Sequence, residues 1–178
     1  MKVSKAAIGW FLSVFFALTL FCCLFTSSVS AGDVLHSVNP TGRTEFSFKD
    51  ASGAPIAVSL TLLQLDNSYP YRDALLWGGD VGQLPRSVVT GMQIQKNNKT
   101  IFIPLSAYSD LGDVKFVSFG AMPHGFRVSL HGGNTATSYD ATLFFDGLAL
   151  IRREVRLREL PEESWERTLY ESPSRAEQ

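Results

Sequence analysis

Hydrophobic and polar residues alternate along most of the chain, which is the pattern of half-buried β-strands. Phe46 and Phe48 alternate with polar residues over 44–49, and Val58, Leu60 and Leu62 do so over 56–65. Further strands are expected at 87–96, 100–104, 114–119, 126–131, 139–145 and 148–157. With about eight strands and one or two short helical turns, the pattern predicts an all-β fold, either a single antiparallel β-sandwich or a partly open barrel.

One strand breaks the alternation. The dipeptide Asp146-Gly147 is the strongest hairpin signal in the chain. In the strand that follows it, Leu150 falls on one face and Val155 on the other if the strand is regular. A β-bulge near residues 149–151 would bring both to the same face, and we predict one there.

Residues 1–31 have the three-part layout of a secretory signal: two lysines, a long apolar run and a short stretch of small and polar residues. We expect cleavage after Ala31, a single β-rich extracytoplasmic domain over 32–171, and a disordered tail over 172–178. The apolar run is also about long enough to span a bilayer, so an uncleaved anchor is the alternative and would be the domain's one link to a membrane.

The composition bears on the compartment. Both cysteines, Cys22 and Cys23, lie in the leader, and a mature chain without cysteine favours a bacterial periplasm over a secreted eukaryotic protein. The triplet Asn98-Lys99-Thr100 is a potential glycosylation site and points the other way. The expected location is therefore periplasmic or secreted.

Several chemistries are disfavoured. Without the two leader lysines, 14 basic and 17 acidic residues remain, a formal charge of −3 that argues against nucleic-acid binding. The histidines His36, His124 and His131 lack metal-site spacing, so no metal or cofactor is expected. No nucleophile motif such as Gly-x-Ser-x-Gly is present, and no catalytic residue is assigned. A triad scattered through the fold would leave no local signature, so an unrecognised hydrolase stays as a third hypothesis.

Two regions are candidate binding surfaces. The long loop over 66–85 carries Tyr69, Tyr71, Arg72 and Trp77, residue types that suit protein or sugar recognition. The alternative for Trp77 is that it folds inward and closes one end of the fold.

The second surface is a mixed-charge patch. If the turn after strand 126–131 is centred near residues 134–135, then Arg127, His131 and Asp140 share one polar face. Ordinary solvent-facing pairing would explain the same pattern. From residue 152 onward the chain holds six arginines and seven glutamates, which we interpret as a solvated edge strand, with Trp165 docking into the core.

These features lead to three hypotheses. The first is a non-catalytic exported β domain that binds an extracytoplasmic protein, as an inhibitor or envelope accessory. The second is a carbohydrate-binding module that stacks a glycan on the loop aromatics. The third is the hydrolase.

We predict that the exported protein is cleaved after Ala31, because the small residues Val29 and Ala31 precede Gly32. Intact-mass measurement of the exported protein checks this. A full-length species retained in the membrane would support the anchor instead.

Overall fold

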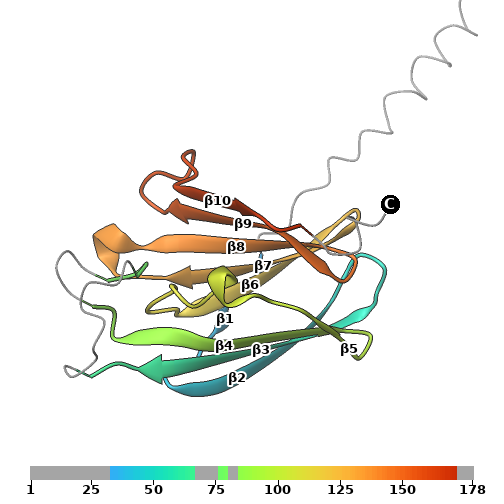
Figure 1. Ribbon diagram of the computed structural model, residues 1–178, viewed down its shortest axis with the longest axis horizontal. Coiled ribbons are helices and arrows are strands. Elements are labelled where there is room, and N and C mark those ends of the chain that lie inside the picture. Colours follow the sequence, from blue (N-terminus) through green and yellow to red (C-terminus); the bar gives the residue numbers. More distant parts are fainter. Residues whose placement is uncertain (1–32, 67–75, 80–83, 172–178) are drawn as a thin grey trace, which may run out of the picture. The chain divides into compact units, whose positions relative to one another are not determined.

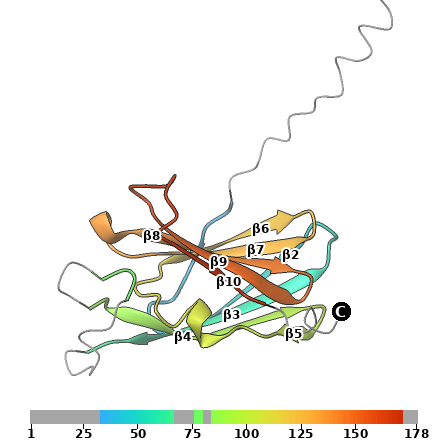
Figure 2. The same cartoon turned by 45° about the horizontal axis from the view of Figure 1, so that its top comes forward.

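The computed structural model describes residues 33–66, 76–79 and 84–171, and it confirms the predicted β-sandwich. Two antiparallel sheets lie face to face (Figure 1, Figure 2). The larger sheet has the strand order β1 (His36–Ser37), β6 (Phe116–Met122), β7 (Gly125–Gly132), β8 (Tyr139–Asp146), β9 (Ala149–Leu157) and β10 (Glu166–Leu169). The smaller sheet has the order β2 (Gly42–Lys49), β3 (Pro55–Gln64), β4 (Ser87–Lys96) and β5 (Lys99–Ile101).

Two of the observed strands were not expected from the alternation. Strand β1 has only two residues, and β10 has four in a segment rich in charge. Neither is long enough to give a clear period-two signal. Two short 3₁₀ turns complete the fold, η2 (Leu105–Ala107) and η3 (Thr135–Thr137).

The core fills the space between the two sheets. From the smaller sheet it takes Val58, Leu60 and Leu62, and from the larger sheet the inward residues of β7 and β8. Aromatic rings join the sheets at one place, where Phe48 stacks on Phe119 with ring centroids 4.2 Å apart and also meets Phe126 edge-on. The alternation therefore identified the inner faces correctly.

Trp165 does not dock into this core, and that expectation was wrong. Its side chain precedes β10 and is 55% exposed, whereas Tyr170, just after β10, packs against the core. Strand β10 pairs with β9 from Glu166, opposite Val155, to Leu169, opposite Arg152. Tyr170 follows directly and reaches the interior. The aromatic anchor of this segment is thus Tyr170.

The predicted bulge is present in the β8–β9 pair. Phe145 pairs with Leu150 and Phe144 pairs with Arg152, so Ile151 is the extra residue. Leu150 and Val155 both become buried as a result. Regular alternation would have turned one of them to solvent.

One end of the sandwich is closed by a close backbone approach at Gly112. A Cβ at Gly112 would collide with the ring of Pro85 and with the carbonyl oxygen of Trp77. The backbone of the next residue, Asp113, is left-handed, with a φ of 49°. The carboxylate of Asp113 accepts a hydrogen bond from the Ser87 N–H, which ties this turn to β4.

The predicted signal segment over 1–31 and the predicted tail over 172–178 lie outside the described residues. Within 33–66, 76–79 and 84–171, no helix has the length and apolar character needed to cross a membrane.

We predict that Leu60→Ala lowers the free energy of unfolding by about 2–5 kcal/mol, because Leu60 is fully buried and its loss leaves a cavity. Trp165→Ala should change it by no more than about 0.5 kcal/mol, as is usual for an exposed side chain. Chemical denaturation of the two variants checks both values. Equal effects would show that the assignment of Trp165 to the surface is mistaken.

Candidate functional site

The outer face of the six-stranded sheet carries a groove lined by arginines. A hollow of about 350 Å³ is lined by Arg127, Arg156 and Arg158, by the carboxylates of Asp140 and Glu154, and by Phe144 among others. Arg152 of β9 and Arg167 of β10 also approach Glu154. We call these five arginines with Asp140 and Glu154 the arginine groove.

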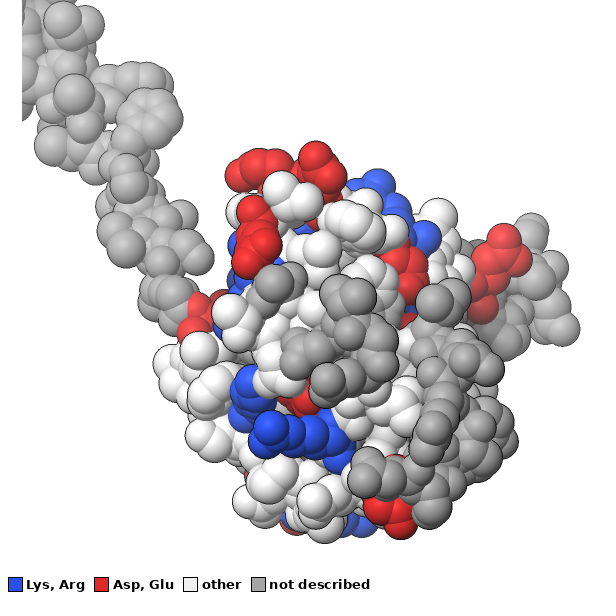
Figure 3. Space-filling model, turned by 90° about the vertical axis from the view of Figure 1, so that its left-hand side faces the viewer, with Lys and Arg blue, Asp and Glu red and all other residues white. Residues whose placement is uncertain are grey.

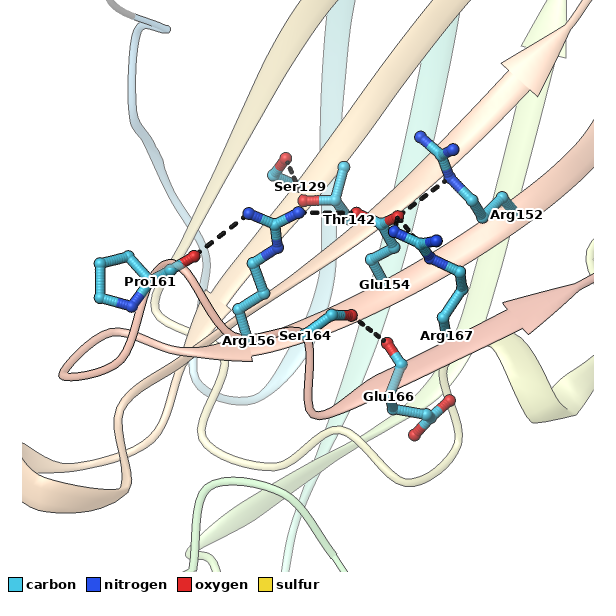
Figure 4. A network of polar contacts seen from close by, with 9 residues as sticks. All are labelled: Ser129, Thr142, Arg152, Glu154, Arg156, Pro161, Ser164, Glu166 and Arg167. Atoms are coloured by element: carbon cyan, nitrogen blue, oxygen red, sulfur yellow. Dashed lines mark hydrogen bonds and ion pairs between the residues drawn. The ribbon is translucent and has the colours of Figure 1, made fainter.

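Glu154 is the centre of the groove. It lies on the outer face of β9, opposite Arg167 of β10, and its side chain is only 6% exposed. Arg167 Nε donates to its Oε1 at 3.0 Å, and Arg156 Nη2 donates to its Oε2 at 3.2 Å. Arg152 Nε lies 3.3 Å from Oε1, at ion-pair distance but without hydrogen-bond alignment. Three guanidinium groups from two strands thus converge on one buried carboxylate (Figure 4).

The arginines are more exposed than the carboxylate that holds them. Their side chains are 36–56% exposed across the groove. Each guanidinium has five N–H donors, and one carboxylate offers about four acceptor sites, so Glu154 cannot satisfy three guanidiniums. Together with Asp33, which pairs with Arg127, the groove holds five arginines and three carboxylates, a formal charge of +2, whereas the whole chain has a formal charge of −1.

Two further contacts fix the positions of the arginines. Arg156 Nη1 donates to the carbonyl oxygen of Pro161 at 3.1 Å, which ties Arg156 to the β9–β10 connection. Arg127 lies across Gly120 of the neighbouring strand, where any Cβ would collide with its side chain, and it donates to Asp33 at 2.8 Å. The cationic groups are thus held in place before any ligand arrives.

The predicted polar patch shares Arg127 and Asp140 with this groove. His131 pairs directly with Asp140 across β7 and β8, and Nδ1 of the ring lies 2.7 Å from the Asp140 carboxylate. Arg127 projects from the same face of β7. The sequence argument therefore placed these three residues together correctly.

Asp140 is held ionised by its neighbours. Partial burial by itself raises the pKa of this carboxyl group, but hydrogen bonds from His131 and Arg158, together with their charges, lower it below the usual range for aspartate. Arg158 Nε donates to the same oxygen at 2.9 Å. At neutral pH, Asp140 therefore orients both His131 and Arg158.

His131 also completes a hydrogen-bonded chain that resembles a catalytic triad. Its Nε2 lies 2.9 Å from the Ser118 hydroxyl, while its Nδ1 faces Asp140. A nucleophile must be reached by its substrate, and Ser118 lies within β6 and is 1% exposed. The chain therefore orients side chains on the sheet surface and does not support acyl transfer.

Of the four candidate binding residues in the loop over 66–85, the structure describes one, Trp77. Tyr69, Tyr71 and Arg72 lie outside the described residues. Trp77 is half-buried. Its backbone N–H donates to the backbone carbonyl oxygen of Asp110, and the centroid of its ring lies 6.1 Å from that of the Tyr139 ring. Trp77 packs against the core at one end of the sandwich, which is the inward alternative.

The interpretation of the charged segment as a solvated edge strand was wrong for β9. Strand β10 pairs along β9, so β9 is interior to the sheet, and both Arg153 and Glu154 are buried. Arg153 points to the core side, where it donates to the Ser106 carbonyl oxygen and to Asp110, each at 2.7 Å. Sequence reasoning missed these contacts because Asp110 and Arg153 come from distant segments.

The positive surface is local. At the end of the domain seen in Figure 3, basic and acidic side chains form small separate clusters, so neither positive nor negative charge covers the whole of the part drawn in colour.

Among the described residues, no three histidine, cysteine, aspartate or glutamate side chains come together in a way that could hold a metal ion.

Comparison with family models, with curated proteins and with solved structures gave no match for this chain.

We predict that Glu154→Gln lowers the free energy of unfolding by about 1–3 kcal/mol, because it removes the charge that three guanidinium groups share. The matched control is Glu45→Gln, which breaks an exposed pair with Arg43 and should cost about 1 kcal/mol or less. Denaturant unfolding compares the two. Stability unchanged by Glu154→Gln would show that the three arginines do not depend on this carboxylate.

Proposed function

We propose that this chain is a non-catalytic binding domain, exported through its leader to the periplasm or the exterior, that recognises a partner protein through the arginine groove. One observation carries the proposal: a buried glutamate holds three arginines in fixed positions while leaving their remaining donors toward solvent. A structural ion pair needs one cation for one anion. The surplus of cations here suits a ligand that brings the missing negative charge.

The chemistry of the groove fits a protein partner. Arginine is enriched at the energetic centres of protein interfaces, because its planar group binds carboxylates through two parallel hydrogen bonds. Here the side chains are already ordered by Glu154, Asp140 and Pro161, so less conformational entropy is lost on binding. The aromatic residue Phe144 lines the same hollow. A positively charged area with one aromatic residue in its lining is therefore available for an interface.

The other two hypotheses receive less support. The carbohydrate hypothesis depends mainly on Tyr69 and Tyr71, which lie outside the described residues, while Trp77 packs against the core. The hydrolase hypothesis has one candidate arrangement in the described chain, and there Ser118 is inaccessible. Protein binding is thus the function that the groove supports best.

We predict that removing two groove arginines weakens partner binding. The protein with Arg156→Gln and Arg167→Gln should lose at least about thirtyfold in affinity, equivalent to about 2 kcal/mol for an interface anchor. Affinity capture from envelope extract identifies the partner, and titration against that partner measures the loss. The matched control, Arg43→Gln, removes an arginine from the outer face of the other sheet and should bind normally.

Thermal melting of each variant is the folding control. Capture that survives the double substitution would contradict the proposal. If binding is lost instead in a variant with Tyr69, Tyr71 and Arg72 changed to alanine, the interface belongs to the loop. Specific retention on glycan arrays rather than on a protein would favour the carbohydrate module.

A further inference from the structure

Three of the five groove arginines follow β9 and its continuation beyond Leu157, at the spacing of side chains in an extended ligand. Arg152, Glu154 and Arg156 occupy alternate positions on the outer face of β9, and Arg158 follows two residues later. Alternate residues of a strand lie about 6.6–6.8 Å apart. A second extended chain has this same repeat, so its alternate side chains can follow the row of arginines.

The donors in this row match carboxylates. A guanidinium group binds a carboxylate through two parallel N–H···O bonds, which gives both energy and direction. Arg167 already holds a carboxylate within the fold, since its Nε and Nη2 both approach Oε1 of Glu154, at 3.0 and 2.9 Å. A glutamate or aspartate from a ligand would meet the same type of donor at Arg156 and Arg158.

The groove is poorly suited to a sugar. Recognition of a sugar ring commonly uses the open face of an aromatic side chain, and Phe144 is the aromatic residue that lines the hollow. The guanidinium of Arg152 lies over the Phe144 ring, 4.0 Å from its centroid. With that face covered, the groove offers charge and hydrogen-bond donors.

We propose, on the basis of the function proposed above, that the partner enters the arginine groove as an extended acidic peptide segment, with glutamate or aspartate at alternate positions. Its carboxylates bind Arg156 and Arg158, while Glu154 holds the guanidinium of Arg156 and Asp140 holds that of Arg158. The formal charge of the whole chain is −1, so a general attraction for anions does not account for such binding.

The test uses a fluorescein-labelled peptide of alternating glutamate and threonine, about eight residues long so that it exceeds the row from Arg152 to Arg158. Fluorescence anisotropy against the purified full chain should show saturable binding that weakens as salt is raised. The matched peptide with glutamine in place of glutamate should bind at least about tenfold more weakly, because it lacks the charge.

Variants locate the site. Arg158→Gln and Arg156→Gln should each weaken binding of the glutamate peptide about tenfold, and Arg43→Gln should leave it unchanged. Arg158 does not contact Glu154, so its variant tests the groove even if Arg156→Gln impairs folding. Equal binding of the two peptides, or equal losses from Arg43→Gln and Arg158→Gln, would overturn the inference.

Two competitors distinguish other anions. If inorganic phosphate displaces the peptide at concentrations similar to those of the peptide itself, the groove is a site for small anions. If a sulfated heparin hexasaccharide binds more tightly than the peptide, the ligand is an acidic glycan. Either result overturns the peptide assignment.

The inference and the proposed function can fail separately. Partner capture that needs Arg156 and Arg167, together with no binding of the glutamate peptide, would reject the acidic segment and retain the interface. Capture that ignores the groove would reject the proposed function even if the peptide binds.

Discussion

The extra residue in β9, Ile151, is the constraint on which both faces of the larger sheet depend. Because side chains alternate along a strand, Leu150 in the core would place Arg152, Glu154 and Arg156 in the core as well if β9 were regular. Burying three charges there would be very costly. The bulge moves these residues to the outer face and leaves Arg153 and Val155 inside. The core and the arginine groove therefore depend on one local irregularity.

The charge that remains inside, Arg153, links the larger sheet to the connection between β5 and β6. Its guanidinium reaches the Ser106 carbonyl oxygen and Asp110, and it lies 3.4 Å from Glu166 of β10. A buried cation is tolerated only when its charge and hydrogen bonds are matched, so these partners confine both segments to their places. The position of β10 in turn sets Arg167 opposite Glu154. Arg153 and Glu154, which are consecutive in β9, thus both contact β10: Arg153 on the core side through Glu166, and Glu154 on the solvent side through Arg167.

Features of one strand or one hairpin could be predicted from the sequence. The alternation predicted β4 with its observed bounds, Ser87–Lys96, and it located the bulge and placed His131 and Asp140 on one face. Features that depend on which distant segments become neighbours could not. Strand β10 has no clear period, and the burial of Glu154 depends on that strand being present. The charge-rich sequence after residue 152 looked solvated because charges are rarely buried unless they are paired, and pairing is a property of the fold.

Short and long polar side chains on the outer face of the larger sheet differ in how far a ligand can reach them. This difference favours binding over catalysis. Ser118, His131 and Asp140 have the connectivity of a triad, but the sheet packs the hydroxyl out of reach. The arginines beside them are long enough to hold a carboxylate at the sheet surface with one nitrogen and present others to solvent. On this face the short side chain of Ser118 is buried, while the long arginine side chains keep part of their surface in solvent. This difference in length is why the face that buries the Ser118 hydroxyl also presents preorganised guanidinium groups to solvent.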